Sequence, residues 1–218
     1  MLNRIVIATT DNERDQVVAE YAKELGVGCY RGSEEDVLDR TYKAAKEFGA
    51  DIIVRVTSDC PLNDPFLIDK MIKHFLDSNL DYLCNRKPPT FPDGFDIEIF
   101  NFKSLEIAWK EAEFKFEREH VTPYISERKN IFKVGNYSYG KDYSSIRLTV
   151  DYEEDFKLVK RIYDALYKKG SIFTLEDILE FIEKNPKLVD LNSKYVRDEK
   201  YHKERKEELQ KNKKENGF

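Results

Sequence analysis

Short apolar runs alternate with helix-spaced segments through the first 85 residues. The apolar runs are residues 5–8, 29–31, 51–56 and 81–85. The segments between them carry apolar residues at helical spacing and cover residues 17–25, 36–48 and 64–77. Strands that alternate with helices predict an α/β fold, with a Rossmann-like, mostly parallel sheet and helices on both of its faces.

The pattern changes after residue 85. A proline-rich loop at 87–94 precedes a run of alternating character at 95–100, which predicts a half-buried strand. Further strands are predicted at 132–137 and 146–150, and helices at 105–114, 117–126, 153–168 and 174–185. We expect the aromatic-rich middle to form a small β-containing insertion for an acceptor or for dimerisation. Residues 1–190 then form one α/β domain, and residues 191–218 form a charged helical tail.

Composition excludes several classes of protein. The chain has 218 residues, a net charge of −5 and three cysteines without a CxxC pair. A disulfide framework, a zinc site and a nucleic-acid partner are therefore not expected. The sequence contains no apolar run of membrane-spanning length, its first residues do not resemble a signal peptide, and GxGxxG and GxxxxGK[ST] motifs are absent. We expect a cytoplasmic protein without a membrane partner.

Two aspartates directly follow predicted strands. Asp59 follows the run at 51–56, and Asp151 follows the run at 146–150. Ligands of open parallel sheets bind beyond the carboxyl ends of the strands, and paired carboxylates there can bind Mg²⁺. The alternative is structural, because Asp59 could start a turn and Asp151 could cap the helix at 153–168.

Other charged residues have structural alternatives too. Residues 34–36 favour a helix start, which leaves Asp39 and Arg40 one turn in, facing solvent or a ligand. The cluster Glu117–His120 is typical of salt pairs on an exposed helix. His120 is also a candidate general base, although no serine or cysteine nucleophile motif accompanies it. His74 is expected to be structural.

Six ordered motifs over residues 4–200 resemble one family. They are IVIATTDN (5–12), RGSEEDVLDR (31–40), RVTSDCPL (55–62), PDGFDIE (92–98), EREHVTPY (117–124) and RLTVD (147–151). Together they resemble the spore-coat polysaccharide branch of the cytidylyltransferases, which is related to the acylneuraminate and 3-deoxy-manno-octulosonate cytidylyltransferases.

The resemblance implies a homodimeric nucleotidyltransferase that transfers CMP from CTP to a small sugar, sugar acid or sugar-phosphate-like acceptor, with Mg²⁺ as cofactor. It implies Asp59 and Asp151 as metal ligands, and Arg118 and His120 as catalytic residues of the segment that faces the acceptor. The nucleotide-binding residues implied by the resemblance are Thr9, Asp11, Gly32, Asp39, Arg40 and Arg55.

The sequence departs from the family pattern at its start. The family's first strand and its basic loop, Ala-Arg-x-Gly-Ser-x-Arg-Leu-Pro-Gly-Lys, have no counterpart in the sequence, and Ser58 and Tyr152-Glu153 differ from the usual residues. We therefore expect weak CTP binding. Three alternatives follow: a cytidylyltransferase whose start is set downstream, a catalytically incomplete relative acting as a binding or dimerisation module, and a metal-dependent glycosyltransferase. The motifs at 32–40 and 117–124 disfavour the last.

Overall fold

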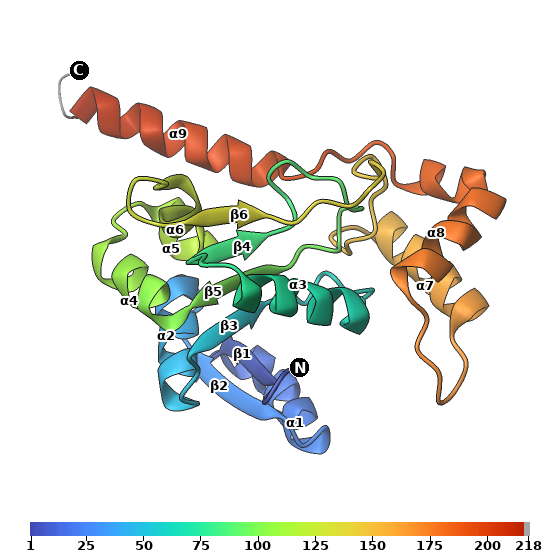
Figure 1. The fold of residues 1–218 in the computed structure, drawn as a ribbon, viewed down its shortest axis with the longest axis horizontal. Helices are drawn as coiled ribbons and strands as arrows, with labels where there is room; N and C mark the ends of the chain where they lie inside the picture. Colours follow the sequence, from blue (N-terminus) through green and yellow to red (C-terminus); the bar gives the residue numbers. More distant parts are fainter. Residues whose placement is uncertain (216–218) are drawn as a thin grey trace.

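The computed structural model describes the backbone of residues 1–215 and the side chains of residues 1–199 and 201–212, with strands in two sheets (Figure 1). The strands are β1 (Val6–Thr10), β2 (Gly28–Gly32), β3 (Ile52–Arg55), β4 (Tyr82–Cys84), β5 (Glu98–Asn101) and β6 (Val134–Asn136). The α-helices are α1 (Gln16–Glu24), α2 (Val37–Glu47), α3 (Pro65–Asp77), α4 (Phe102–Glu111), α5 (Lys115–His120), α6 (Pro123–Glu127), α7 (Glu153–Leu166), α8 (Leu175–Lys184) and α9 (Glu199–Glu215). Two 3-10 helices cover Glu13–Asp15 and Pro186–Leu191.

The structure confirms the predicted α/β class, although the strands form two sheets and the larger one contains an antiparallel strand. Strands β1 and β2 pair in parallel and form a two-stranded sheet. The larger sheet has the order β3-β5-β4-β6, in which β5 is antiparallel to both of its neighbours and β6 is parallel to β4. Strands β3, β4 and β6 therefore run in one direction, and β5 alone runs against them.

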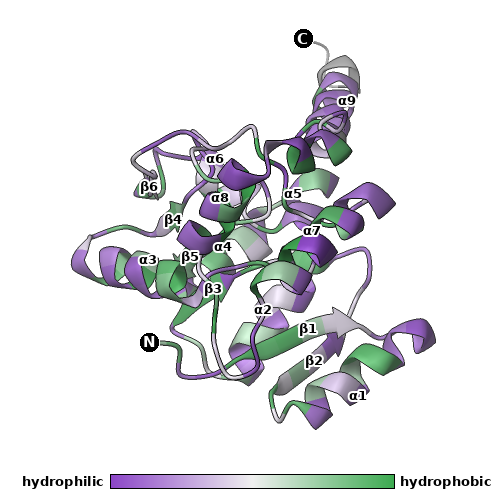
Figure 2. Ribbon diagram, turned by 90° about the vertical axis from the view of Figure 1, so that its right-hand side faces the viewer, coloured by the Kyte–Doolittle hydropathy of each residue, from purple (hydrophilic) through white to green (hydrophobic). Residues whose placement is uncertain are grey.

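Both faces of the larger sheet are covered by helices. Side chains alternate between the two faces of a strand, so Leu83 and Ile99 lie in one apolar cluster while Tyr82 and Phe100 lie in the other. The first cluster is completed by α3, α7 and α8, and the second by α2, α4 and α6. The apolar segments of these helices are the green parts of their ribbons in Figure 2, whereas α9 is largely hydrophilic.

The predicted half-buried strand at 95–100 is corrected by the structure. Strand β5 covers Glu98–Asn101 and lies between β3 and β4, so both of its faces are covered. Even Glu98 is only 4% exposed. A strand with partners on both edges has no free edge on which a strand of a second copy could pair.

Two other predicted elements differ in the structure. The helix expected at 117–126 is divided into α5 and α6, because Val121 has a φ of 70° and Pro123, which has no N–H to donate, begins α6. The strand expected at 146–150 is an extended segment with one parallel bridge, between Asp93 and Arg147. Both segments keep the predicted positions along the chain, although their hydrogen bonding differs.

Within the expected charged tail at 191–218, the structure has turns up to residue 198 and then α9, and residues 216–218 lie outside the described part of the chain. Helix α9 runs alongside α5 (Figure 1). Glu208 of α9 accepts the backbone N–H groups of Lys115 at 2.6 Å and Phe116 at 3.0 Å, which satisfies two donors at the start of α5. The helix is therefore docked on the domain.

Candidate active site

The ends of β1 and β2 form one wall of a cavity of about 610 Å³. The strands are parallel and Thr10 pairs with Gly32, so their carboxyl ends lie side by side. Three of the predicted nucleotide-binding residues, Asp11, Gly32 and Asp39, line this cavity. The other lining residues are Tyr30, Arg31, Ser33, Glu34, Glu35 and Lys43.

Arg40 and Thr9 lie next to this cavity. The Arg40 guanidinium contacts the turn after β2, where its Nη1 donates to the Ser33 carbonyl at 2.6 Å. Its Nε is buried and has no hydrogen-bond partner among the described residues, and burial lowers the pKa of Arg40. Thr9 pairs with Arg31 across β1 and β2. The Arg40 guanidinium thus stabilises the turn after β2, which includes the cavity-lining residue Ser33.

Asp39 is held by two donors. Trp109 Nε1 donates to its Oδ1 at 2.9 Å, and Lys43 Nζ lies 2.7 Å from its Oδ2. Burial raises the pKa of Asp39, but these hydrogen bonds outweigh burial and the net pKa is lowered. Asp39 therefore presents a fixed, ionised carboxylate at the cavity wall.

Asp59 and Asp151 are brought together beyond the end of β3. The Val150 N–H donates to the Asp59 carbonyl at 2.8 Å, and Thr149 Oγ1 lies 3.2 Å from Asp59 Oδ2. Asp151 is 48% exposed at its side chain and accepts a hydrogen bond from Arg147 Nη2 at 2.6 Å. Two segments that are 90 residues apart in the sequence therefore place carboxylates at one end of the sheet.

The donors in this region fit a hard cation. The carboxylates of Asp59 and Asp151 and the hydroxyl of Thr149 are oxygen donors, which Mg²⁺ prefers. Burial raises the pKa of the neighbouring Cys60 to about 12, so this sulfur is a neutral thiol at pH 7. A thiol does not compete as a ligand in the way a thiolate would.

A network of buried and half-buried ions extends from Asp151 to the segments that follow β4 and precede α9. Arg147 binds Asp93 and Asp155 at 3.0 Å each. Arg197 binds Asp96 and lies 3.5 Å from Asp93. Arg86 binds Asp198 and lies 3.8 Å from Asp96, which joins the pairs into one network. These residues come from the segments at 86–96, 147–155 and 197–198. Burial raises the pKa of Asp93 to about 6, although the positive charges of Arg197 and Arg147 oppose this shift.

Sequence reasoning missed most of this network. Arg86 follows β4 much as Asp59 follows β3, and that position could have revealed it. Arg197 and Asp198 gave no such signal, because a mixed run of charges usually indicates a solvated helix.

Arg118 joins α5 to the start of α2. Its Nη2 donates to Asp36 Oδ2 at 2.6 Å, its Nε lies 3.1 Å from both Asp36 oxygens, and its Nη1 donates to the Trp109 carbonyl at 2.7 Å. Asp36 also caps α2 by accepting the Asp39 N–H. The partners of Arg118 thus come from α2 and α4 rather than from the segments that carry Asp59 and Asp151.

Arg55 and His120 also have partners away from those aspartates. Arg55 Nη1 binds buried Glu98 at 2.5 Å, and Glu98 also accepts the Tyr82 hydroxyl at 2.6 Å and a hydrogen bond from Thr122. His120 faces Tyr201 and Glu204 of α9. The structure therefore places the predicted site residues in two groups, Asp59 with Asp151 and the three residues that line the cavity. Arg55, Arg118 and His120 lie in neither group, because their partners are Glu98, Asp36 and residues of α9.

Comparison with known proteins reveals clear relatives. Residues 1–212 match the family model described as cytidylyltransferase. The chain is 42% identical over 205 residues to the uncharacterized protein MJ1063 of Methanocaldococcus jannaschii, which covers 92% of this chain and 81% of the relative. It is 30% identical over 187 residues to the spore coat polysaccharide biosynthesis protein SpsF of Bacillus subtilis, which covers 84% of this chain and 76% of the relative.

A solved structure is also similar. A cytidylyltransferase from Leptospira borgpetersenii matches with a TM-score of 0.82 and 37% identity, covering 88% of this chain and 80% of that chain. Among the described residues, none of the helices is long and apolar enough to cross a membrane.

Proposed function

Because the chain belongs to the cytidylyltransferase family, and is thus a nucleotidyltransferase, we propose that it transfers CMP from CTP to a sugar, sugar acid or sugar-phosphate-like acceptor. The acceptor is proposed to be a precursor of a surface polysaccharide, which is consistent with the name of the Bacillus subtilis relative. The observation that carries the proposal is the contact between the Asp59 and Asp151 segments beyond the end of β3, where the Val150 N–H donates to the Asp59 carbonyl.

We propose Asp59 and Asp151 as the ligands of Mg²⁺. When bound, the ion would neutralise negative charge on the triphosphate oxygens. Arg147 orients Asp151 through its Nη2, and the Thr149 hydroxyl lies beside the carboxylate of Asp59. These contacts hold both carboxylates in place before substrate arrives, which reduces the cost of assembling the site.

The proposed reaction is an in-line displacement. An acceptor oxygen forms a bond to the α-phosphorus of CTP, the bond from that phosphorus to the bridging oxygen of pyrophosphate breaks, and the acceptor loses a proton. The proposed nucleotide contacts are those of the cavity, where the fixed carboxylate of Asp39 can accept hydrogen bonds from ribose or base. Thr9, Arg40 and Arg55 remain predicted nucleotide-binding residues, and Arg118 and His120 remain predicted acceptor-side residues.

The homodimer and the cytoplasmic location also remain predictions. Strand β5 lies inside the sheet, so a dimer would have to use another surface.

Nucleotide binding tests the proposal without knowledge of the acceptor. We expect calorimetric titration of the full chain, with Mg²⁺ present, to show tighter binding of CTP than of UTP or ATP. The substitutions Asp59→Asn and Asp151→Asn should remove the Mg²⁺ dependence of CTP binding. Asp164→Asn is the matched control, because Asp164 is an exposed residue of α7 that pairs with Lys160. Equal binding of the three nucleotides would contradict the assignment of CTP.

Turnover gives a second test once an acceptor is found in a panel of sugar acids and sugar phosphates. Pyrophosphate release should fall at least about 100-fold in Asp59→Asn, because a catalytic metal contributes several kcal/mol to the transition state. Asp164→Asn should keep the rate of the parent chain. Full turnover by Asp59→Asn would refute its role as a metal ligand.

A further inference from the structure

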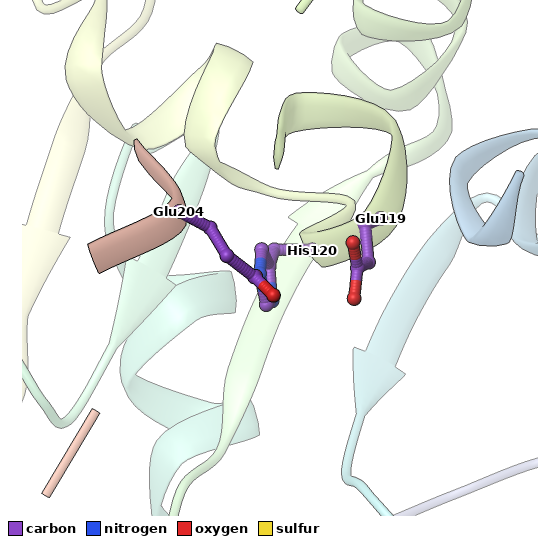
Figure 3. A group of neighbouring side chains, drawn as sticks. All are labelled: Glu119, His120 and Glu204. Carbon is purple, nitrogen blue, oxygen red and sulfur yellow. The ribbon is translucent and has the colours of Figure 1, made fainter. Parts of the chain in front are cut away.

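Helix α9 brings a third potential metal ligand to α5. Glu119 and His120 are the last two residues of α5, and Glu204 lies in the second turn of α9. One ligand atom from each of the three side chains can be chosen so that all three lie within 4.8 Å of one another. Figure 3 shows the carboxylate of Glu204 beside the ring of His120, with Glu119 on the other side.

The imidazole ring of His120 is held in place, but one of its nitrogens lacks a hydrogen-bond partner among the described residues. Its ring contacts Tyr201 edge-on, with centroids 4.9 Å apart, so the orientation of the ring is restricted. Its Nε2 is buried and has no hydrogen-bond partner among the described residues. Glu204 Oε2 lies 3.6 Å from Nε2, which is longer than a hydrogen bond. A buried imidazole nitrogen without a hydrogen-bond partner is a free-energy cost, which a cation coordinated by this nitrogen would remove.

We propose that Glu119, His120 and Glu204 form a binding site for one divalent transition-metal ion of the Zn²⁺ class, which joins α9 to α5. One imidazole and two carboxylates are a ligand set that Zn²⁺ accepts, whereas Mg²⁺ and Ca²⁺ prefer oxygen ligands alone. Two carboxylates also balance the charge of the ion. Three protein ligands leave the fourth position of a tetrahedral ion open to water.

The distances suit such an ion. With metal–ligand bonds of about 2.1 Å, neighbouring ligand atoms of a tetrahedral ion are about 3.4 Å apart. The 3.6 Å between His120 Nε2 and Glu204 Oε2 is close to this ligand-to-ligand distance. All three chosen ligand atoms lie within 4.8 Å of one another.

The site is separate from the proposed Mg²⁺ site and does not rest on the proposed function. Its ligands include a nitrogen, and they come from two helices rather than from the ends of strands. A bound ion would also secure the chain just before α9, where Arg197 and Asp198 pair with Asp96 and Arg86. Metal at α5 would thereby stabilise the ion network beside Asp59 and Asp151.

Metal binding to the full chain tests the site. After treatment with a chelator, the chain is titrated with Zn²⁺ by calorimetry and with Co²⁺ by visible absorption. We expect one Zn²⁺ or Co²⁺ per chain at this site, with Co²⁺ bands typical of nitrogen and oxygen ligands and no thiolate charge-transfer band. His120→Asn, Glu204→Gln and Glu119→Gln should each weaken binding at least about 10-fold, the smallest loss expected from changing even an outer-shell partner.

Matched controls separate this site from other metal-binding groups. His74→Asn on α3 and Glu207→Gln on α9 change exposed residues of the same types and should bind Zn²⁺ like the parent chain. The double variant Asp59→Asn/Asp151→Asn should also keep this site. Far-UV circular dichroism verifies that each variant is folded, and Zn²⁺ should raise the melting temperature of the parent chain more than that of Glu119→Gln. Absence of Zn²⁺ binding by the parent chain, unchanged affinity in His120→Asn, or loss of binding only in the aspartate double variant would overturn the proposal.

Discussion

Glu98 is a charged side chain in the interior of this protein. Glu98 is 4% exposed and accepts hydrogen bonds from Arg55, Tyr82 and Thr122. Burial raises the pKa of Glu98, but the nearby cations Arg55 and Arg86 and these hydrogen bonds outweigh it, so the pKa is lowered and the group stays ionised. A buried charge persists only with such partners, because desolvation alone would neutralise it.

At Asp93 the effect of burial on the pKa outweighs that of the nearby cations, so the stability of the fold should depend on pH. Its pKa in the folded chain is about 6, above its ordinary value of 3.8, so the folded state binds a proton more tightly than the unfolded state. The free energy of unfolding should therefore rise as the pH falls through 6. Between pH 7 and pH 5 this group should contribute about 1 kcal/mol of added stability. Urea denaturation at both pH values should show the gain in the parent chain and a smaller gain in Asp93→Asn; equal gains would contradict the shift.

At the scale of elements, two backbones approach closely at Gly94. Its φ is +101°, and a Cβ built there would lie 2.5 Å from the carbonyl carbon of Leu148 and from the nitrogen of Thr149. The segment at 92–95 thus packs directly against the extended segment before Asp151. Only glycine permits both the backbone conformation and this separation.

Gly94→Ala should therefore destabilise the fold. We expect a loss of at least about 2 kcal/mol in urea denaturation, since strained φ and a backbone clash act together. Gly140→Ala is the matched control, because a Cβ at Gly140 meets no atom within 4 Å, and it should change stability little. A parent-like urea denaturation curve for Gly94→Ala would contradict the close packing of the two segments.

The junction between α5 and α2 gives a second prediction at this scale. Arg118→Lys keeps the charge but loses the planar fork that binds both oxygens of Asp36 and the Trp109 carbonyl. We expect about 1–3 kcal/mol less stability by urea denaturation. Arg161→Lys, at an exposed position on α7, should have no measurable effect. Unchanged stability of Arg118→Lys with lost turnover would instead favour the catalytic role implied by the family resemblance.

At the scale of the whole molecule, one sheet separates two apolar clusters. Leu38 of α2 is fully buried in one cluster and Ile178 of α8 is fully buried in the other. Adjacent residues of β4 and β5 contribute to opposite clusters, so loss of one cluster removes support from the strands that form the other. We expect the two clusters to unfold together.

Leu38→Ala and Ile178→Ala test this cooperativity. Each should lower the free energy of unfolding by about 2–5 kcal/mol, as expected for a large-to-small change in a core. The transitions followed by Trp109 fluorescence and by far-UV circular dichroism should coincide in both variants. Leu76→Ala, at a residue of α3 that is 53% exposed, should change stability little. Separate transitions for the two probes would indicate that the clusters unfold independently.

Much of the candidate site could be predicted where the chemistry follows a local pattern. Asp59 and Asp151 were recognised by their positions at the ends of apolar runs, and the structure does bring their backbones together, even though residues 146–150 are not a strand. The partners of Arg118 and His120 could not be predicted, because they come from α2, α4 and α9. No periodicity within 117–124 indicates which distant helices cover it.

The sequence by itself determined the alternation of strands and helices, the α/β class and which polar residues follow the apolar runs, because backbone sterics and side-chain periodicity act over a few residues. Only the tertiary structure decided that β5 enters the sheet between β3 and β4, that Arg86, Arg147 and Arg197 share one ion network, and that α9 docks on α5. These contacts join residues up to 112 positions apart. Their partners are determined by the burial of apolar surface and the pairing of charges across the whole molecule. Both depend on residues that are distant in the sequence, so no local pattern indicates them.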